Sequence, residues 1–231
     1  MSKPALKFKI EWKSKIIDLL IVIIGITIAF KLNNWNETNK TESKVQEYLK
    51  SFYDENNVNQ ENLVSVLEYS KSKKRDVDTL KGILLSNNYS DKRIKTLTTK
   101  LMGMANYSPI ITTMQNISSS GEFDVIKDIE LRRLLIDTYE AYKTTANLEL
   151  LVSNYVNQYA SPFLFEKIRL SDFSAIKSDF TNDPIFENIV FGYDILLAQL
   201  IRGYEQNLDK VFQLKERLTT ANDVISRAKS S

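Results

Sequence analysis

Apolar residues form one dense run near the N-terminus, over residues 16–30. The run lacks the polar stripe of an interfacial helix, and it is richer in Ile, Leu and Val on every face than a buried soluble helix. Trp12 and Trp35 flank it 23 positions apart. At about 1.5 Å per residue this separation is roughly 35 Å, which suits the two interfaces of a bilayer. The pattern predicts a transmembrane helix over residues 16–32.

The two flanks of the predicted span differ in charge. Five lysines precede it within residues 1–15, whereas Lys31 and Lys40 are the nearest basic residues after it. The positive-inside rule then predicts a short basic cytoplasmic tail, residues 1–15, and a domain of residues 33–231 outside the cytoplasm. A cleaved signal peptide is the alternative, but residues 30–34 offer no small-residue cleavage site. The expected location is the inner membrane, single-pass, with the domain in the periplasm.

Helical spacing continues beyond the span. Neither glycine nor proline occurs between Gly25 and Gly82, so the anchor is expected to continue as one helix into water. Apolar residues recur every three or four positions over residues 45–67. Asn56 and Asn59 fall on the same seam, which indicates either a buried polar contact or a loosened stretch.

The rest of the chain alternates helical spacing with turn signals. The basic cluster of residues 71–75 suggests a solvated turn or helix face, followed by a second helical stretch over residues 76–85. Further helices are predicted from Ile94 to Met104, from Ser108-Pro109, from Leu131 to Tyr159 with an end or kink at Pro162, and from Asp183-Pro184 to Ala228, with a turn at Gly121 and irregular segments over residues 86–91 and 169–182. The sum is an all-α protein, in which a single N-terminal transmembrane helix continues into an antiparallel helical bundle of four or more helices.

Charge and composition narrow the function classes. Residues 1–32 hold six lysines and two acidic residues, a net charge of +4, and the remaining residues hold 25 basic and 27 acidic side chains, a net charge of −2. A domain without its own basic excess does not suit nucleic-acid binding. The chain has no Cys and no His, which excludes disulfides and removes the commonest general base and zinc ligand. No metal, cofactor or catalytic residue is therefore expected.

The remaining polar clusters favour structural roles. Ser118, Ser119 and Ser120 stand near a predicted turn and could supply a Ser–Lys catalytic pair, but helix capping is the favoured interpretation. The acidic pairs at positions 54 and 55 and at positions 128 and 130 are expected on solvated faces. A hydrolase is a third-ranked hypothesis, which requires that substitution of one of these serines abolish a measured activity.

Small residues mark one face of the predicted span. Asp18, Val22, Gly25 and Ala29 share a helical face, and Gly25-x-x-x-Ala29 is a small-xxx-small pattern that permits close approach of another helix. This face predicts self-association or docking of a partner within the membrane. The alternative is a chance pattern, because small residues are common in membrane helices.

Five polar and aromatic residues follow where the predicted helix leaves the bilayer: Asn33, Asn34, Trp35, Asn36 and Glu37. Three asparagines are poor helix formers in a helix that is expected to continue, and such a local conflict is typical of functional or partner-binding sites. Their amides could bond lipid headgroups or a neighbouring helix. The segment is the leading candidate for partner contact, with plain interfacial anchoring by the tryptophan as the alternative.

The stretch of residues 21–37, IVIIGITIAFKLNNWNE, resembles the N-terminal signature of a family of uncharacterised bacterial single-span membrane proteins. That signature is an acidic residue, an apolar run and then N-N-W-N-E. Residues 117–132 and the Asn-Asp-Pro opening of the last helix at 182–184 are also similar to the family. Asp18 stands where the family usually has Glu, and Ile17 where it usually has Gly. The resemblance implies the single-span helical architecture and little about chemistry, because the family carries no established activity.

These inferences favour a non-catalytic function. The first hypothesis is a membrane-anchored helical interaction module of the bacterial envelope, which docks a protein partner or forms a homo-oligomer. The alternative is an extracytoplasmic bundle that senses a ligand and signals through a membrane partner, since a tail of about 15 residues leaves no room for an output domain. The expected partners are the lipid bilayer and a protein, and not a nucleic acid.

Overall fold

Helices make up almost all of the protein. The computed structural model describes residues 12–169, 171–172, 174–176 and 180–229, so most of the predicted tail, residues 1–11, lies outside the described residues. No strand occurs among the described residues, although an isolated backbone bridge joins Ile168 to Ala175. The predicted all-α class is confirmed. The elements are α1 (Trp12–Leu85), α2 (Arg93–Thr99), the 3-10 helix η1 (Lys100–Met102), α3 (Thr112–Ser119), the 3-10 helix η2 (Phe123–Val125), α4 (Ile129–Tyr155), the π-helix η3 (Val156–Ala160), α5 (Ser161–Lys167), the 3-10 helix η4 (Phe180–Asn182) and α6 (Pro184–Lys229).

The chain divides into two units, residues 1–47 and residues 48–231. In the first unit, α1 carries the apolar run, and none of its most apolar window is buried. By length and composition this stretch could cross a membrane. α6 passes the same test, but 39% of its window is buried, as is usual for a core helix. Among the described residues, the N-terminal run is therefore the exposed candidate span.

The part of α1 in the second unit presents one long buried seam. Buried positions recur at spacings of three and four residues without a break, so α1 continues as one helix to Leu85. Of the two alternatives for residues 71–75, the helix face is confirmed and the turn is wrong, and the separate stretch over residues 76–85 is wrong as well, because α1 is continuous. Lys73 is buried and continues the seam, so the cluster is not solvated throughout. The seam consists of Leu49, Phe52, Asn56, Asn59, Leu63, Leu67, Ser70, Lys73, Val77, Leu80 and Leu84.

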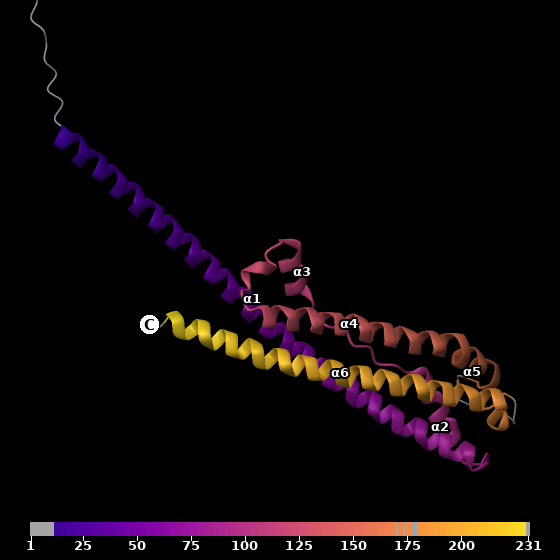
Figure 1. Cartoon of the computed structure of the whole chain (residues 1–231). Coiled ribbons are helices and arrows are strands. Elements are labelled where there is room, and N and C mark those ends of the chain that lie inside the picture. The colour runs from indigo at the N-terminus through magenta and orange to yellow at the C-terminus, as the bar shows by residue number, and fades with distance from the viewer. Residues whose placement is uncertain (1–11, 170, 173, 177–179, 230–231) are drawn as a thin grey trace, which may run out of the picture. The chain divides into compact units, whose positions relative to one another are not determined.

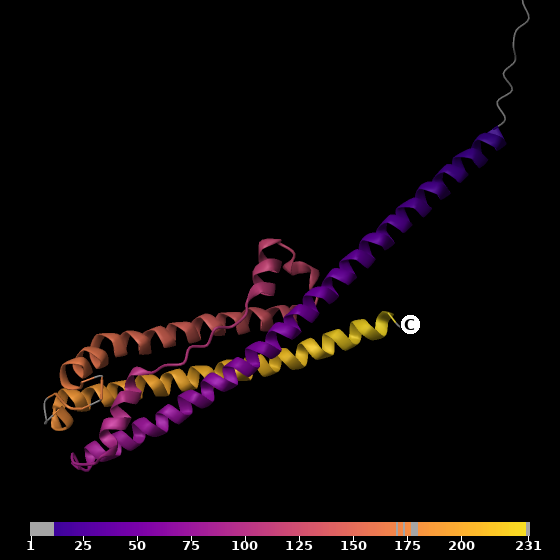
Figure 2. The same ribbon diagram turned by 180° about the vertical axis from the view of Figure 1, so that it is seen from behind.

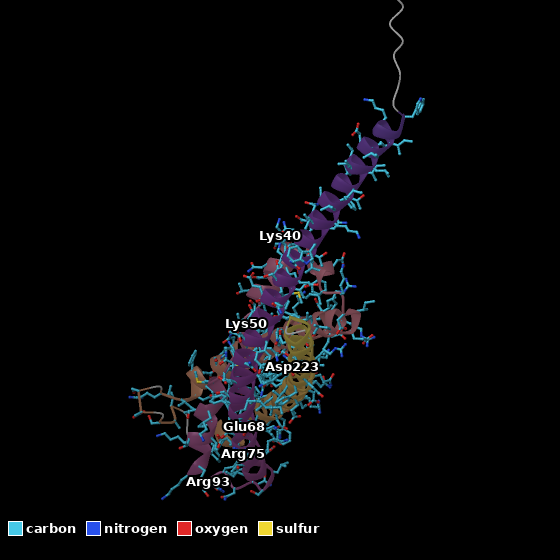
Figure 3. The ribbon with its side chains drawn as sticks, turned by 90° about the vertical axis from the view of Figure 1, so that its left-hand side faces the viewer. Lys40, Lys50, Glu68, Arg75, Arg93 and Asp223 are labelled. Atoms are coloured by element: carbon cyan, nitrogen blue, oxygen red, sulfur yellow. The ribbon has the colours of Figure 1, made fainter. Side chains whose placement is uncertain are left out.

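Charged side chains occupy the opposite face of α1 in this unit. Lys50, Glu68 and Arg75 are exposed, and Figure 3 shows them along the helix. This division into a buried seam and a charged face is the pattern of an amphipathic helix packed against neighbours on one side only.

α6 packs along α4, and the second-unit part of α1 crosses both helices (Figures 1 and 2). Side chains of α1 reach both, since Asn56 donates to the Val211 carbonyl of α6 at 3.0 Å and Phe52 meets the Tyr139 ring of α4. Tyr204 of α6 donates a hydrogen bond to Glu149 of α4, and Asn207 one helical turn later donates to Thr145. Residue numbers therefore rise along α6 as those of their partners fall along α4, so the two helices run in opposite directions. Gly203 permits the close approach, because a Cβ there would lie 2.5 Å from Cδ1 of Leu148.

A connecting segment without regular secondary structure, residues 103–111, precedes α3. The sequence predicts a helix opening at Ser108-Pro109, and this prediction is wrong, because α3 begins at Thr112. Side chains of the bundle bond to the main chain of this segment and so compete with the helical pattern. We call residues 103–111 the strap.

Local signals place several other element ends as predicted. The Asp183 carboxylate accepts the backbone N–H of Ile185 at 2.9 Å and so caps the start of α6. Gly121 has a φ of 71°, a left-handed conformation that favours glycine, and it ends the turn after α3. Pro162 lies in the first turn of α5, directly after the π-helical turn η3, which agrees with a kink at this position.

Candidate functional site

The predicted membrane-exit segment, Asn33 to Glu37, lies within α1, and all five of its side chains are exposed. The helix continues through the three asparagines, as the absence of glycine and proline predicts. Two threonine hydroxyls bond back to main-chain carbonyls of the segment, Thr38 to Asn34 and Thr41 to Glu37, both at 2.9 Å. The Glu37 carboxylate also pairs with Lys40 at 3.1 Å. The exit segment thus presents its asparagine and tryptophan side chains outward.

The predicted packing face of the span is exposed as well. Asp18, Val22, Gly25 and Ala29 are exposed positions of α1, and a Cβ added at Gly25 would meet no atom within 4 Å. The face is therefore open to a helix from another chain. No contact among the described residues uses it, and its role stays a prediction.

Two polar side chains of the bundle hold the strap by its main chain. Asn59 of α1 donates to the carbonyl of Ile110 at 2.8 Å and accepts the N–H of the same residue at 2.7 Å. Glu149 of α4 accepts the N–H of Tyr107 at 2.7 Å. Asn59 bonds both main-chain groups of Ile110, so it can hold an extended segment whatever side chain stands at position 110. The strap is therefore held in the manner of a bound extended peptide.

Glu55 of α1 anchors the start of α3. Its Oε1 accepts both the N–H and the hydroxyl of Thr113 at 2.7 Å, and its Oε2 accepts the hydroxyl of Tyr139 at 3.1 Å. The expectation that positions 54 and 55 form a solvated acidic pair is wrong for Glu55. Asp128 likewise caps α4 by accepting the N–H of Leu131 at 3.0 Å. Glu55 meets a helix start 58 residues away, and sequence spacing alone does not show such a contact.

Four aromatic rings pack together, one from Tyr107 of the strap and three from α1 and α4. Phe52 meets Tyr139 with ring centroids 6.2 Å apart, Tyr139 meets Tyr142 at 5.2 Å, and Tyr142 meets Tyr107 at 5.6 Å, all near edge-to-face. Burial raises the pKa of the Tyr107 and Tyr139 hydroxyls far above the usual value, and the nearby carboxylates act in the same direction. These hydroxyls therefore stay protonated and can serve as hydrogen-bond donors but not as bases.

A groove of about 680 Å³ lies between α3, the end of the strap and α4. Its volume is within the range of sites that bind ligands and peptide side chains. Both of its isoleucines are partly exposed, Ile136 by 48% and Ile111 by 37%, so they add apolar surface to the same hollow. We call it the α3–α4 groove, and its lining residues are Pro109, Ile111, Met114, Gln115, Ser118, Ser119, Ile136, Tyr139, Glu140, Tyr142, Lys143 and Ala146.

The serine cluster lies at the C-terminal end of α3, and two of its members line the α3–α4 groove. Ser118 contacts the sulfur of Met114 at 3.7 Å, and Ser120 donates to the carbonyl of Ile117 at 3.1 Å, at the end of the helix. Lys143, the groove lysine, pairs with Glu140 at 2.5 Å. No Ser–Lys hydrogen bond occurs among the described residues, and no group of three acidic side chains that could hold a metal occurs there either. The serines are therefore positioned by the helix end and not by a base.

A charged cluster joins α1 to α6 on another side of the bundle. Asp194 is 8% exposed and pairs with Lys81 at 2.5 Å and with Lys74 at 2.9 Å. Burial by itself raises the pKa of the Asp194 carboxyl, but the hydrogen bonds and charges of the two lysines outweigh it and hold that pKa below its usual value. The cluster is a structural clamp, because its lysines also meet Asp78 and the ring of Phe191.

Comparison with known sequences places the chain in a family. The profile of a family of unknown function, DUF6090, matches residues 18–162. The chain belongs to this family. The match takes in the N-N-W-N-E segment and residues 117–132, on which the resemblance rests, and it ends before residues 182–184. No curated protein and no solved structure matches the chain significantly.

The DUF6090 match also covers the strap, α3 and the whole of α4, whereas α6 lies outside it. The α3–α4 groove, which spans positions 109–146, lies entirely within the matched residues. Sequence reasoning did not find this groove. The signal available was a pair of isoleucines, Ile111 and Ile136, on either side of the turn at Gly121.

Proposed function

We propose that this DUF6090 chain is a membrane-anchored, non-catalytic helical interaction module of the bacterial envelope. In this proposal residues 16–32 cross the inner membrane once, with the N-terminus in the cytoplasm. The second unit is an antiparallel helical bundle in the periplasm, and its α3–α4 groove docks one apolar face of a helix from a protein partner. Asn33 to Glu37 and the face of Asp18 and Gly25 form a second contact surface at and within the membrane.

The observation that carries the proposal is the exposed apolar lining of the groove. Ile136 and Ile111 present apolar surface to solvent from two different elements, and both line the same hollow. The groove has apolar walls and a polar rim, and the rim consists of Gln115 and the ion pair of Glu140 and Lys143. Such a groove between two helices fits the helix-in-groove mode of recognition. The anchor is supported by the exposed apolar run and by the excess of lysines before it.

Site-specific photo-crosslinking in cells tests the proposal. The full chain is expressed with a photoreactive residue at position 111, inside the groove, or at position 195 on α6, where Ile195 is 59% exposed but does not line the groove. We expect a discrete protein adduct from position 111 and none from position 195. Burying one isoleucine side chain contributes about 1.5–3 kcal/mol, so Ile136→Glu should weaken the complex roughly 10- to 100-fold and remove the adduct.

Ile195→Glu is the matched control, since it places the same charge on an exposed isoleucine of another helix. An adduct that persists in Ile136→Glu, or that Ile195→Glu removes equally, contradicts docking in the groove. Photoreactive residues at positions 33 and 36, in place of Asn33 and Asn36, test the second surface. Adducts with lipid alone would contradict protein contact there and favour a role in interfacial anchoring. A small molecule that strongly raises the unfolding temperature of the full chain, with no protein adduct, would favour the ligand-sensing alternative.

A further inference from the structure

A lysine lies inside the bundle with no acidic partner in contact. Lys73 of α1 is 6% exposed, and its Nζ has no hydrogen-bond partner among the described residues. The amine borders a cavity of about 10 Å³, which also reaches Tyr69, Tyr193 of α6 and Met104 of the strap. The main chain of Gly103 closes over it, because a Cβ there would lie 3.3 Å from both Lys73 Nζ and the Tyr69 hydroxyl.

The surroundings of the amine compensate its charge only in part. Nζ lies 5.7 Å from the ring centroid of Tyr69 and 5.9 Å from that of Tyr193, near the limit at which an aromatic face attracts a cation. Burial lowers the pKa of Lys73 to about 8, against the opposing effect of Asp76. Since that value is above neutral pH, most of the amine is still protonated there. A buried ammonium without a counter-charge is costly.

The cavity is lined mostly by apolar side chains, and its buried polar groups without a partner in the described part of the chain are the Lys73 amine and the Tyr193 hydroxyl. The nearby carboxylate, that of Asp76, is engaged elsewhere. The Tyr193 hydroxyl is fully buried and has no partner among the described residues, so it can donate to whatever occupies the cavity. Asp76 pairs with Lys100 of η1 at 2.8 Å. Lys100 opposes the effect of Asp76 on the pKa of Lys73, but the effect of Asp76 is the larger. Two buried donors to which the described residues offer no partner, the Lys73 ammonium and the Tyr193 hydroxyl, therefore give the cavity the polar groups of an anion site.

We propose that this cavity binds one monatomic anion of the halide class, chloride in the cell, between Lys73 Nζ and the Tyr193 hydroxyl. Its volume of about 10 Å³ suits one small particle and not a large organic anion such as gluconate. The bound anion neutralises the buried ammonium and satisfies the tyrosine donor, and it joins α1, the strap and α6. This site is separate from the α3–α4 groove and does not depend on the function proposed for that groove.

Thermal unfolding of the full chain in detergent micelles tests the site. Unfolding is followed by far-ultraviolet circular dichroism in sodium chloride or sodium bromide, and in sodium gluconate at equal ionic strength, since gluconate is too large for the cavity. We expect the unfolding midpoint to rise by about 3–6 °C with the halides and not with gluconate. Lys73→Met and Tyr193→Phe should each lose the halide-specific rise, whatever their own midpoint is.

Lys71→Met is the matched control, because Lys71 lies on the same helix and pairs with Glu205 at 2.9 Å outside the cavity. It should keep the full halide response. A crystal grown with bromide should show an anomalous peak within hydrogen-bond distance of Lys73 Nζ. An ordered water there instead of bromide, or an equal response to gluconate and chloride, overturns the proposal, as does a halide response that survives in Lys73→Met.

Discussion

Asn56 and Asn59 make a matched pair for testing what holds the strap. Both are buried asparagines of α1, three residues apart on the same seam, and both can be replaced by leucine, a side chain of similar shape. Their partners differ. Asn59 bonds both main-chain groups of Ile110, at 2.7 and 2.8 Å, whereas Asn56 makes one bond, from Nδ2 to the carbonyl of Val211 at 3.0 Å, and its Oδ1 has no partner among the described residues.

The expected effects of the two substitutions follow from these bonds. Asn59→Leu removes the two bonds to Ile110 and a 3.5 Å bond to the Tyr142 hydroxyl. The N–H and carbonyl of Ile110 then lack a protein partner, at a cost of about 1–3 kcal/mol each. Water replaces part of this loss because Ile110 is 39% exposed, and the added apolar burial offsets about 1 kcal/mol. The free energy of unfolding should therefore fall by about 2 kcal/mol. Asn56→Leu removes one bond and one unsatisfied oxygen, so it should change the free energy by less than about 1 kcal/mol.

Urea unfolding of the full chain in detergent, followed by far-ultraviolet circular dichroism, measures both values. Tryptophan fluorescence is unsuitable, because Trp12 and Trp35 both lie in the first unit. Hydrogen exchange supplies the local readout. Exchange of strap amides should accelerate in Asn59→Leu and stay unchanged in Asn56→Leu. Equal destabilisation by the two substitutions, or unchanged exchange of the strap in Asn59→Leu, would refute the view that this asparagine holds the strap by its main chain.

Two further predictions concern the contacts of α6. Gly203→Ala should lower the free energy of unfolding by about 1–3 kcal/mol in the same urea assay, because the new Cβ would overlap Leu148, and Leu148→Ala in the same chain should restore part of the loss. Asp194→Asn should cost about 2 kcal/mol at neutral pH by leaving Lys74 and Lys81 without their shared partner. The lowered pKa of Asp194 means that this stability is fully present above the unfolded value of about 3.9 and is lost as the pH falls through the folded value. Unfolding measured from neutral to acid pH should therefore show the difference between wild type and Asp194→Asn shrinking, and a constant difference would contradict the assignment.

Local sequence signals determined the helical class and several helix ends. The apolar run, the long stretch from Gly25 to Gly82 without glycine or proline, and the Asp183-Pro184 start all act through the backbone of neighbouring residues, and α1 and α6 follow them. The seam of three- and four-residue spacings over residues 45–67 also holds, with both asparagines buried and bonded, because helical periodicity depends only on the chain's own geometry.

Tertiary structure decided everything that depends on a partner distant in sequence. Pro109 suits a helix start, but Asn59 and Glu149 bond the main chain around it, so the strap stays extended and α3 begins later. Lys73 looks like part of a solvated cluster in the sequence and is buried in the structure, because its position on the seam of α1 faces α6. The α3–α4 groove has the same origin, since its walls come from segments on either side of Gly121 whose spacing in the sequence does not show that they face each other.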